Sequence, residues 1–538
     1  MQKIFVFPRM QMIVFFRVNS KCQRRHEPVI TSRSSEVKIN VCHPKSLVVK
    51  VSIVPKMVLK ETIFTVVVLL NAIESSSWQS STFDLIGKRQ SIALSYSRQE
   101  YDANKDNVFL VDEMCHTSSQ LRLISPFEQA IENESSPIFK MLKIASNREE
   151  RGQPVLNFAV GNPSLEPPAA VLHSMAKVTA LSNGNKRKGV YKYTNPSGLL
   201  PLREYIASEI GDWQQNPSLT ADNVILTPGA QSGIVNILQA LLLEGDTVLV
   251  QTPYYPDFLS MVELWGCHVG KINFDDKSFD LSLESIKQLT EKSGDRLRVM
   301  LLCSPSNPTG KVLGKSTIDS IIEIISEHSK KHKRDVWLVM DHTYWRLSYE
   351  NVVPPTFPHY KSTLLISSFS KDMSLAGERI GYVTVNPKHQ KSKQLAEFIS
   401  QNNGRLGNIS PPSLIQHALL DTYRTHGYLP SLMEEYEERV RLMHKGLLLA
   451  GMSSCYKPDG AFYLFPRLPD GIDDYDFAES LTNHGVLVIP GSEFGAPGFL
   501  RFAALEPECV MEEAFMIIRT LLLKYQKDIK RCNALNGQ

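Results

Sequence analysis

The sequence lacks the patterns that would place it in several common classes of protein. Its eight cysteines in 538 residues are scattered, with no Cys-x-x-Cys pair and no cysteine and histidine group at zinc-site spacing. This is the profile of a reduced protein without a disulfide framework. The net charge of +3 gives no case for a nucleic-acid partner. There is no internal repeat, and the composition, 42% apolar and 21% charged, is that of a globular protein.

Also missing is an apolar run long enough to cross a bilayer, which takes about 20 residues. The run at residues 63–73 is mostly apolar but only eleven residues long, so we expect no stable membrane span. Residues 1–60 hold twelve Lys and Arg but only two acids, a balance typical of an organelle transit peptide. A misassigned start, with the true one at Met57 or Met114, is the competing explanation of this segment.

We therefore expect residues 1–120 to be a leader or extension rather than a folded domain, with residues 74–120 disordered because they are polar and aperiodic. The expected compartment is cytoplasmic, or mitochondrial or plastid if the leader is real.

Apolar runs alternate with helical stretches through the middle of the chain. The runs end at Thr227, Thr252, Ser304, Asp341 and Ser368. This alternation predicts a mainly parallel sheet with helices on both faces. Because ligands of such sheets bind at the carboxyl ends of the strands, the residues just after each run are the candidates for chemistry.

The most specific of these ends is the run Ser-Phe-Ser-Lys-Asp-Met-Ser-Leu-Ala-Gly-Glu-Arg-Ile-Gly-Tyr at residues 368–382. Lys371 follows a buried strand, where a cation is costly but a neutral or imine-linked amine is useful. The hydroxyls of Ser368 and Ser370 and the guanidinium of Arg379 suit a phosphate dianion. A lysine beside a phosphate clamp is what holds pyridoxal 5'-phosphate as a Schiff base. The alternative is a solvated surface lysine.

Two earlier strand ends supply groups for the ring of such a cofactor. Asp341 ends the run Val-Trp-Leu-Val-Met-Asp and is the candidate partner of the pyridinium nitrogen, although a helix N-cap is an alternative. Tyr344 and Asn307 can donate to the ring phenolate oxygen. For Asn307 the alternative is a simple turn, since Ser-Pro-Ser-Asn-Pro-Thr-Gly is rich in turn residues.

Three further candidates lie outside this run. The turn at Gly229 precedes an apolar helix, so the amides of Ala230 and Gln231 can bind phosphate. Tyr255 can stack on a flat ring, or be an ordinary core or surface aromatic. Arg501 lies inside an apolar strand and needs an anion, either a substrate α-carboxylate or an internal salt bridge.

Together these motifs resemble the class I/II aminotransferases of pyridoxal-phosphate fold type I over residues 126–524. The resemblance implies an α/β fold, with a large domain built on a mainly parallel seven-stranded sheet flanked by helices. It also implies a small α/β domain made from both chain ends. We expect an N-terminal arm and part of the small domain at 121–190, the large domain at 191–425 and the rest of the small domain at 426–528. A long amphipathic helix at residues 430–446 links the two.

Position by position, the resemblance implies that Lys371 is the Schiff-base lysine and proton shuttle, and that Arg501 binds the substrate α-carboxylate. Residues 158–163 look like the substrate loop, with Gly161 closing on the substrate. Residues 191–198 look like the segment that lends Tyr193 to the phosphate of the neighbouring subunit, which implies a homodimer with shared sites. The implied substrate-binding residues are Gly161, Asn307 and Arg501. The implied cofactor-binding residues are Ala230, Gln231, Tyr255, Asn307, Asp341, Tyr344, Ser368, Ser370, Lys371, Arg379 and Tyr193.

The expected activity is transfer of an amino group between an L-amino acid and a 2-oxo acid by a ping-pong mechanism. A lyase or cyclopropane-forming synthase of the same fold is an open alternative, because the named residues mostly bind cofactor. A ligand sensor fused to a DNA-binding head is a further alternative, but residues 1–120 show no helix-turn-helix. The stacking residue is Tyr255 rather than the Trp of the aspartate enzymes, and no residue is assigned to a second, distal carboxylate.

Overall fold

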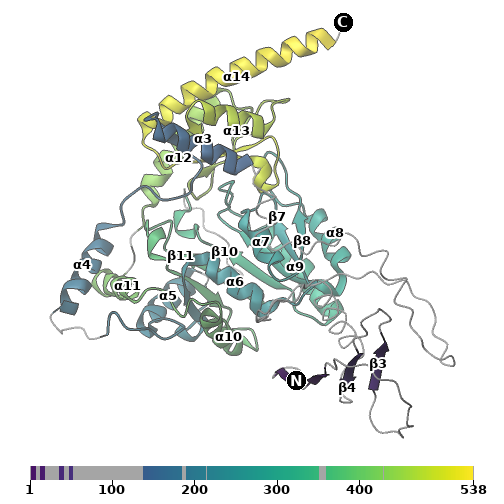
Figure 1. Cartoon of the computed structure of the whole chain (residues 1–538). Coiled ribbons are helices and arrows are strands. Elements are labelled where there is room, and N and C mark those ends of the chain that lie inside the picture. Colours follow the sequence, from purple (N-terminus) through teal and green to yellow (C-terminus); the bar gives the residue numbers. More distant parts are fainter. Residues whose placement is uncertain are drawn as a thin grey trace. The chain divides into compact units, whose positions relative to one another are not determined.

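The protein divides into two units, residues 1–97 and 98–538, and Figure 1 shows the computed structural model of the chain. The structure describes residues 2–7, 12–17, 36–40, 48–52, 137–183, 189–213, 215–349, 359–427, 429 and 431–536. In the first unit, β1 (Gln2–Phe7) pairs with β2 (Met12–Arg17), and β3 (Glu36–Asn40) with β4 (Val48–Ser52), both antiparallel. The rest of the predicted leader, including residues 74–120, lies outside the described residues.

The second unit is built on a seven-stranded sheet in the order β6-β12-β11-β10-β9-β7-β8. Its strands are β6 (Val224–Thr227), β7 (Thr247–Gln251), β8 (His268–Ile272), β9 (Leu297–Cys303), β10 (Trp337–Asp341), β11 (Thr363–Ser368) and β12 (Gly381–Val385). Strand β12 runs antiparallel to both of its neighbours, β11 and β6, and the other six strands all run in the same direction. The predicted mainly parallel sheet of seven strands is confirmed.

Alternate residues of each strand enter opposite helical layers, as the twofold period of a strand requires. In β9, Met300 and Leu302 pack in one core while Val299 and Leu301 pack in the other. The first core includes α4 (Ala169–Asn183), α5 (Leu200–Trp213), α8 (Leu283–Ser293), α9 (Lys315–His332) and α11 (Ser413–His426). The second includes α6 (Gly229–Leu241), α7 (Asp257–Glu263) and α10 (Ser392–Arg405). Helices thus cover both faces of the sheet.

A third core joins residues 141–159 and 344–349 to residues 436–522. It gathers α3 (Pro137–Glu150), α12 (Met433–Ala450), α13 (Asp474–Asn483) and α14 (Glu508–Asn536), which lie together in Figure 1. The strands here are short: β13 (Tyr463–Leu464), β16 (Leu500–Ala503) and β15 (Ile489–Pro490) form one sheet, and β5 (Leu156–Asn157) pairs with β14 (Val486–Leu487).

Both ends of the described second unit therefore contribute to one core, as expected of a small domain. The helix predicted at residues 430–446 is α12, while the proposed domain boundaries stay a prediction. Within the described ranges, no helix has the length and apolar character needed to cross a membrane.

His342 follows β10 and makes the stability of the folded protein depend on pH. Its Nδ1 lies 2.6 Å from the Ser304 carbonyl oxygen, and burial lowers its pKa to about 4. In the unfolded chain this histidine has an ordinary pKa near 6.5, so below that pH it binds a proton. The folded chain binds this proton only near pH 4. This contribution to stability is present above about pH 6.5 and is lost as pH falls toward 4.

We expect His342→Gln to flatten the acid side of the stability profile. Between pH 7.5 and pH 5 the wild type should lose about 2 kcal/mol more of its free energy of unfolding than the variant. Urea unfolding at the two pH values measures the difference. Equal losses in both proteins would mean that His342 is not responsible.

Candidate active site

A cavity of about 360 Å³ opens where the strand ends of the large sheet face the small-domain core. This volume is in the range of small-molecule sites. Every residue predicted for the site except Tyr193 lines it. These are Gly161, Ala230, Gln231, Tyr255, Asn307, Asp341, Tyr344, Ser368, Ser370, Lys371, Arg379 and Arg501. Since β9, β10 and β11 are neighbours, residues far apart in sequence meet at their carboxyl ends.

Tyr193 lies elsewhere. Its side chain is 87% exposed, and it lines a separate depression with Tyr191, Lys192, Thr194 and residues 410–413. The single chain therefore does not bring Tyr193 to the cavity. That position is compatible with the predicted contribution to a neighbouring subunit, which stays a prediction.

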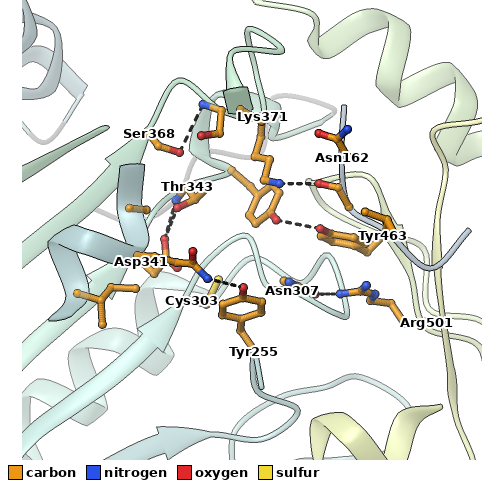
Figure 2. Close-up of a pocket in the computed structure, with 18 of the residues that line it drawn as sticks. Asn162, Tyr255, Cys303, Asn307, Asp341, Thr343, Ser368, Lys371, Tyr463 and Arg501 are labelled. Carbon is orange, nitrogen blue, oxygen red and sulfur yellow. Dashed lines mark hydrogen bonds between the residues drawn. The ribbon is translucent and has the colours of Figure 1, made fainter. Parts of the chain in front are cut away.

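Lys371 follows β11 and projects its amine into the cavity (Figure 2). Its Nζ donates to the Gly161 carbonyl oxygen at 2.6 Å and lies 5.9 Å from the ring centre of Phe462. The side chain is only half-buried, but it faces the cavity rather than the outer surface. The alternative of an ordinary surface lysine is not found.

Asp341 is the last residue of β10 and is almost fully buried. Its Oδ1 accepts hydrogen bonds from the Thr343 amide at 2.9 Å and the Thr343 hydroxyl at 2.6 Å. Burial raises the pKa of Asp341, while the Thr343 hydrogen bonds and Lys371 lower it. The next helical turn is η4 (Trp345–Leu347), and Tyr344 is its N-cap, so the N-cap alternative for Asp341 is excluded. A buried carboxylate in this position favours a cationic partner in the cavity.

One end of the cavity is a cradle for an anion. Helix α6 starts at Gly229, and its N-cap, Pro228, supplies no side-chain hydrogen bond to the free amides. A Cβ built on Gly229 would lie 2.6 Å from Nη2 of Arg379, so the guanidinium rests directly against the helix start. The buried hydroxyls of Ser368 and Ser370 complete the lining. Amides, hydroxyls and a guanidinium together fit a phosphate group.

The other end of the cavity holds a buried guanidinium. Arg501, on β16, is 8% exposed and lies between the rings of Tyr463 and Phe494, 4.8 and 4.9 Å from their centres. Its Nη1 donates to Asn307 Oδ1 at 3.1 Å, and Nη2 donates to the Ala159 carbonyl oxygen. Nε has no hydrogen-bond partner and no carboxylate pairs with the side chain within the described residues. An internal salt bridge is thus not found, and Arg501 suits an incoming carboxylate.

Tyr255 and Gln231 form a hydrogen-bonded group at the side of the cavity. The Tyr255 hydroxyl donates to Asp257 Oδ2 at 2.5 Å, and Gln231 Nε2 donates to both the Tyr255 oxygen and Asp257 Oδ2, at 2.8 and 2.6 Å. Burial and the Asp257 hydrogen bond raise the pKa of Tyr255. The phenol therefore stays neutral, and these contacts fix the ring where it lines the cavity.

Tyr463, which was not predicted from the sequence, links several parts of the site. Its hydroxyl lies 3.1 Å from that of Tyr344, and a Cβ on Gly161 would fall 1.9 Å from the same oxygen. Its ring also faces Arg501. The tyrosine stands in the apolar run Ala-Phe-Tyr-Leu-Phe, where it cannot be distinguished from a core aromatic. Thr343, the hydrogen-bond partner of Asp341, was also not predicted, because nothing in the sequence distinguishes it from other threonines.

We expect Gly229→Ala to weaken the cradle. At φ +78° an alanine costs about 1–2 kcal/mol, and its Cβ must also displace Arg379. The matched control is Gly152→Ala, at φ +68° with no atom within 4 Å of the new Cβ, which has only the backbone cost. Binding of pyridoxal phosphate, the ligand expected from the sequence, should weaken in the first variant alone when measured by dialysis and absorbance. Equal binding in both variants would exclude a steric role for Gly229.

Comparison with known proteins agrees with this geometry. Residues 153–515 match the family model described as aminotransferase class I and II. A probable aspartate aminotransferase of Methanocaldococcus jannaschii is 28% identical over 376 residues, covering 68% of this chain and 93% of that protein. An aspartate aminotransferase of Thermotoga maritima is 27% identical over 375 residues, covering 68% and 92%.

The crystal structure of an amino transferase from Eubacterium rectale has a TM-score of 0.67 and 25% identity, covering 75% of this chain and 99% of that one. All of these similar proteins are named as aminotransferases, so the lyase or synthase alternative is not favoured. Since the family model matches well over half of the sequence, the chain belongs to the class I and II aminotransferases and is an enzyme that transfers amino groups.

Proposed function

We propose that this cavity binds pyridoxal 5'-phosphate, the cofactor for which the family is known, and that the enzyme uses it to exchange an amino group between an L-amino acid and a 2-oxo acid. One observation carries the proposal. The Lys371 amine lies in the same cavity as an uncapped helix start with Arg379 and as a buried arginine without a carboxylate partner. These are the groups needed to hold an aldehyde, a phosphate and a substrate carboxylate together.

Separate groups of residues would bind the phosphate and the ring of the cofactor. The α6 amides, Ser368, Ser370 and Arg379 would hold the phosphate, and Asp341 would keep the ring nitrogen protonated. Bound in this way, the cofactor supplies an electron sink for negative charge at the substrate Cα.

Around that centre, Lys371 would hold the cofactor aldehyde carbon and, once displaced by the amino acid, move the Cα proton as a general base. Asn307 and Tyr344 would hydrogen-bond the phenolate oxygen, and Tyr255 would lie against the ring. Arg501 would bind the α-carboxylate through its planar pair of nitrogens, which fixes the Cα–H bond next to Lys371.

For the substrate we propose L-aspartate as the first donor to test, because both relatives named above are aspartate aminotransferases. Within the described lining, the cations are Lys371, Arg379 and Arg501, and each already has a role. A distal carboxylate must therefore be recognised by neutral donors or by a second subunit. We further propose a homodimer in which Tyr193 of one copy reaches the phosphate of the other.

The test is a pair of half-reactions with the purified protein loaded with pyridoxal phosphate. An L-amino acid alone should convert the visible absorbance band of the bound cofactor to that of the amine form, and a 2-oxo acid alone should restore it. Initial rates should give parallel double-reciprocal lines. Intersecting lines, or amino acid consumption that no oxo acid reverses, would contradict transamination. Light scattering on the same sample tests the dimer.

A further inference from the structure

A buried ion pair holds the backbone next to Lys371. Asp372 is 1% exposed, and its Oδ2 lies 2.8 Å from Nε of Arg346. Within the described residues, neither carboxylate oxygen of Asp372 has a hydrogen-bond donor from another residue. The charge of Arg346 is therefore the interaction that compensates the burial of this carboxylate. Burial raises the pKa of Asp372 to about 6, and Arg346 acts against that rise.

The guanidinium of Arg346 also reaches two other segments. Nη1 donates to Glu209 Oε1 of α5 at 2.5 Å, and Nη2 donates to the Leu429 carbonyl oxygen. The backbone carbonyl of Asp372 in turn accepts a hydrogen bond of 3.0 Å from the amide of Leu432, the N-cap of α12. One side chain thus connects the exit of β10, the Lys371 segment, α5 and the entrance to α12.

Further contacts support the network on its other sides. Tyr423 of α11 donates to Glu209 Oε2 at 2.5 Å. Trp345, next to Arg346, stacks on Trp213 of α5 with ring centres 4.2 Å apart, and its Nε1 donates to the Tyr382 hydroxyl at 3.3 Å. Because these contacts fix Glu209 and Trp345, they also limit the movement of Arg346 relative to α5 and α11.

The pair stands directly behind two cavity residues. Asp372 is adjacent to Lys371, and Arg346 comes two residues after Tyr344, yet neither Asp372 nor Arg346 lines the cavity. Helix α12 enters the core that also contains residues of β16, the strand of Arg501. A shift of the Arg346–Asp372 pair would therefore move Lys371 relative to both the ring-binding and the carboxylate-binding residues.

We propose that Arg346 and Asp372 are positioning residues for the reaction: their ion pair fixes Lys371 relative to the β10 exit and the start of α12. The inference depends on the proposed role of Lys371 as the cofactor lysine. On this proposal, the position of Lys371 depends on two residues outside the cavity lining, which would contact neither cofactor nor substrate.

Arg346→Gln and Asp372→Asn, each in the full chain loaded with pyridoxal phosphate, test this role. Because small misplacements of catalytic groups are costly, we expect kcat to fall by about tenfold to a hundredfold in each. The KM for the amino acid should change much less, since Arg501 is untouched. The circular dichroism of the visible cofactor band, which reports ring orientation, should change. Arg346→Lys, which keeps the charge, should recover part of both signals.

The matched control is Asp246→Asn. Asp246 is also a fully buried carboxylate paired with an arginine, Arg334, at 2.7 Å, but it stands at the amino end of β7, away from the cavity. This variant should lower Tm and leave the dichroism and kcat unchanged.

If Arg346→Gln and Asp372→Asn behave like this control, the pair is structural only and the inference is overturned. Should Arg346→Gln not fold, Asp372→Asn, which keeps the side-chain volume, decides alone. If the wild type itself forms no visible band with pyridoxal phosphate, the proposed function fails before any variant is compared.

Discussion

Lys371→Ala is expected to lower the kcat of transamination by about 10⁴-fold, the upper end of what a general base contributes, because it removes the group that moves the Cα proton. The same change removes the covalent tether, so the variant should bind pyridoxal phosphate without the absorbance band of the lysine-bound form. Lys371 is the only lysine among the described lining residues of the cavity, so no neighbour can take its place. Single-turnover measurements with an L-amino acid give the rate, and spectra of the loaded variant give the linkage.

The matched control is Lys361→Ala. Lys361 is exposed and precedes β11, whereas Lys371 follows it, so the two stand at opposite ends of one strand. This variant should keep the band and the rate. A Lys371→Ala enzyme that still shows the lysine-bound band would move the assignment to another residue and remove the basis for every role proposed around it.

The second large effect is expected at Arg501. Arg501→Lys keeps a positive charge but loses the planar pair of donors that can bind both carboxylate oxygens. Loss of about 3 kcal/mol of charge-assisted hydrogen bonding should lower kcat/KM by about a hundredfold or more, mainly through KM. Steady-state kinetics with amino acids of different side chains should show a similar factor for each, because all share the α-carboxylate.

Arg467→Lys is the control for Arg501→Lys. Arg467 also faces an aromatic ring, that of Phe499 at 5.5 Å, but it pairs with Asp276 near the surface. Its kinetics should match the wild type. An amine without a carboxylate should react equally slowly with the wild type and with Arg501→Lys. A large difference for that amine would show that Arg501 acts on something other than the carboxylate.

Much of the cavity could be predicted because its chemistry follows apolar strands. Asn307, Asp341 and Lys371 each come just after a run of buried residues, and parallel strands place such positions at one edge. The strand β8 gave no such signal. His268 is exposed and of its five residues only Ile272 is buried, so this edge strand shows no apolar run. The expectation of seven strands, which includes β8, therefore came only from the family resemblance.

Residues that act through tertiary contacts could not be predicted. Tyr463 lies in a two-residue strand within an apolar run, and its place beside Gly161 and Tyr344 comes from the tertiary packing of the core that it shares with Tyr344. Arg346 and Asp372 carry charges that usually indicate a solvated surface. Only the structure shows that Asp372 is buried, that the side chain of Arg346 is nearly so, and that the two are paired.

The connection between β11 and β12 carries two of the site residues on one anchored loop. Ser368 and Gly381 are paired across these antiparallel strands, so residues 369–380 form a closed loop with both ends held in the sheet. Lys371 and Arg379 both lie in this loop, one at the aldehyde end of the proposed ligand and the other at the phosphate end. Because both ends of this short loop are held, its backbone limits how far Lys371 and Arg379 can move apart. The two groups proposed for the aldehyde and the phosphate would therefore stay on one anchored segment rather than on two parts of the chain that can move independently.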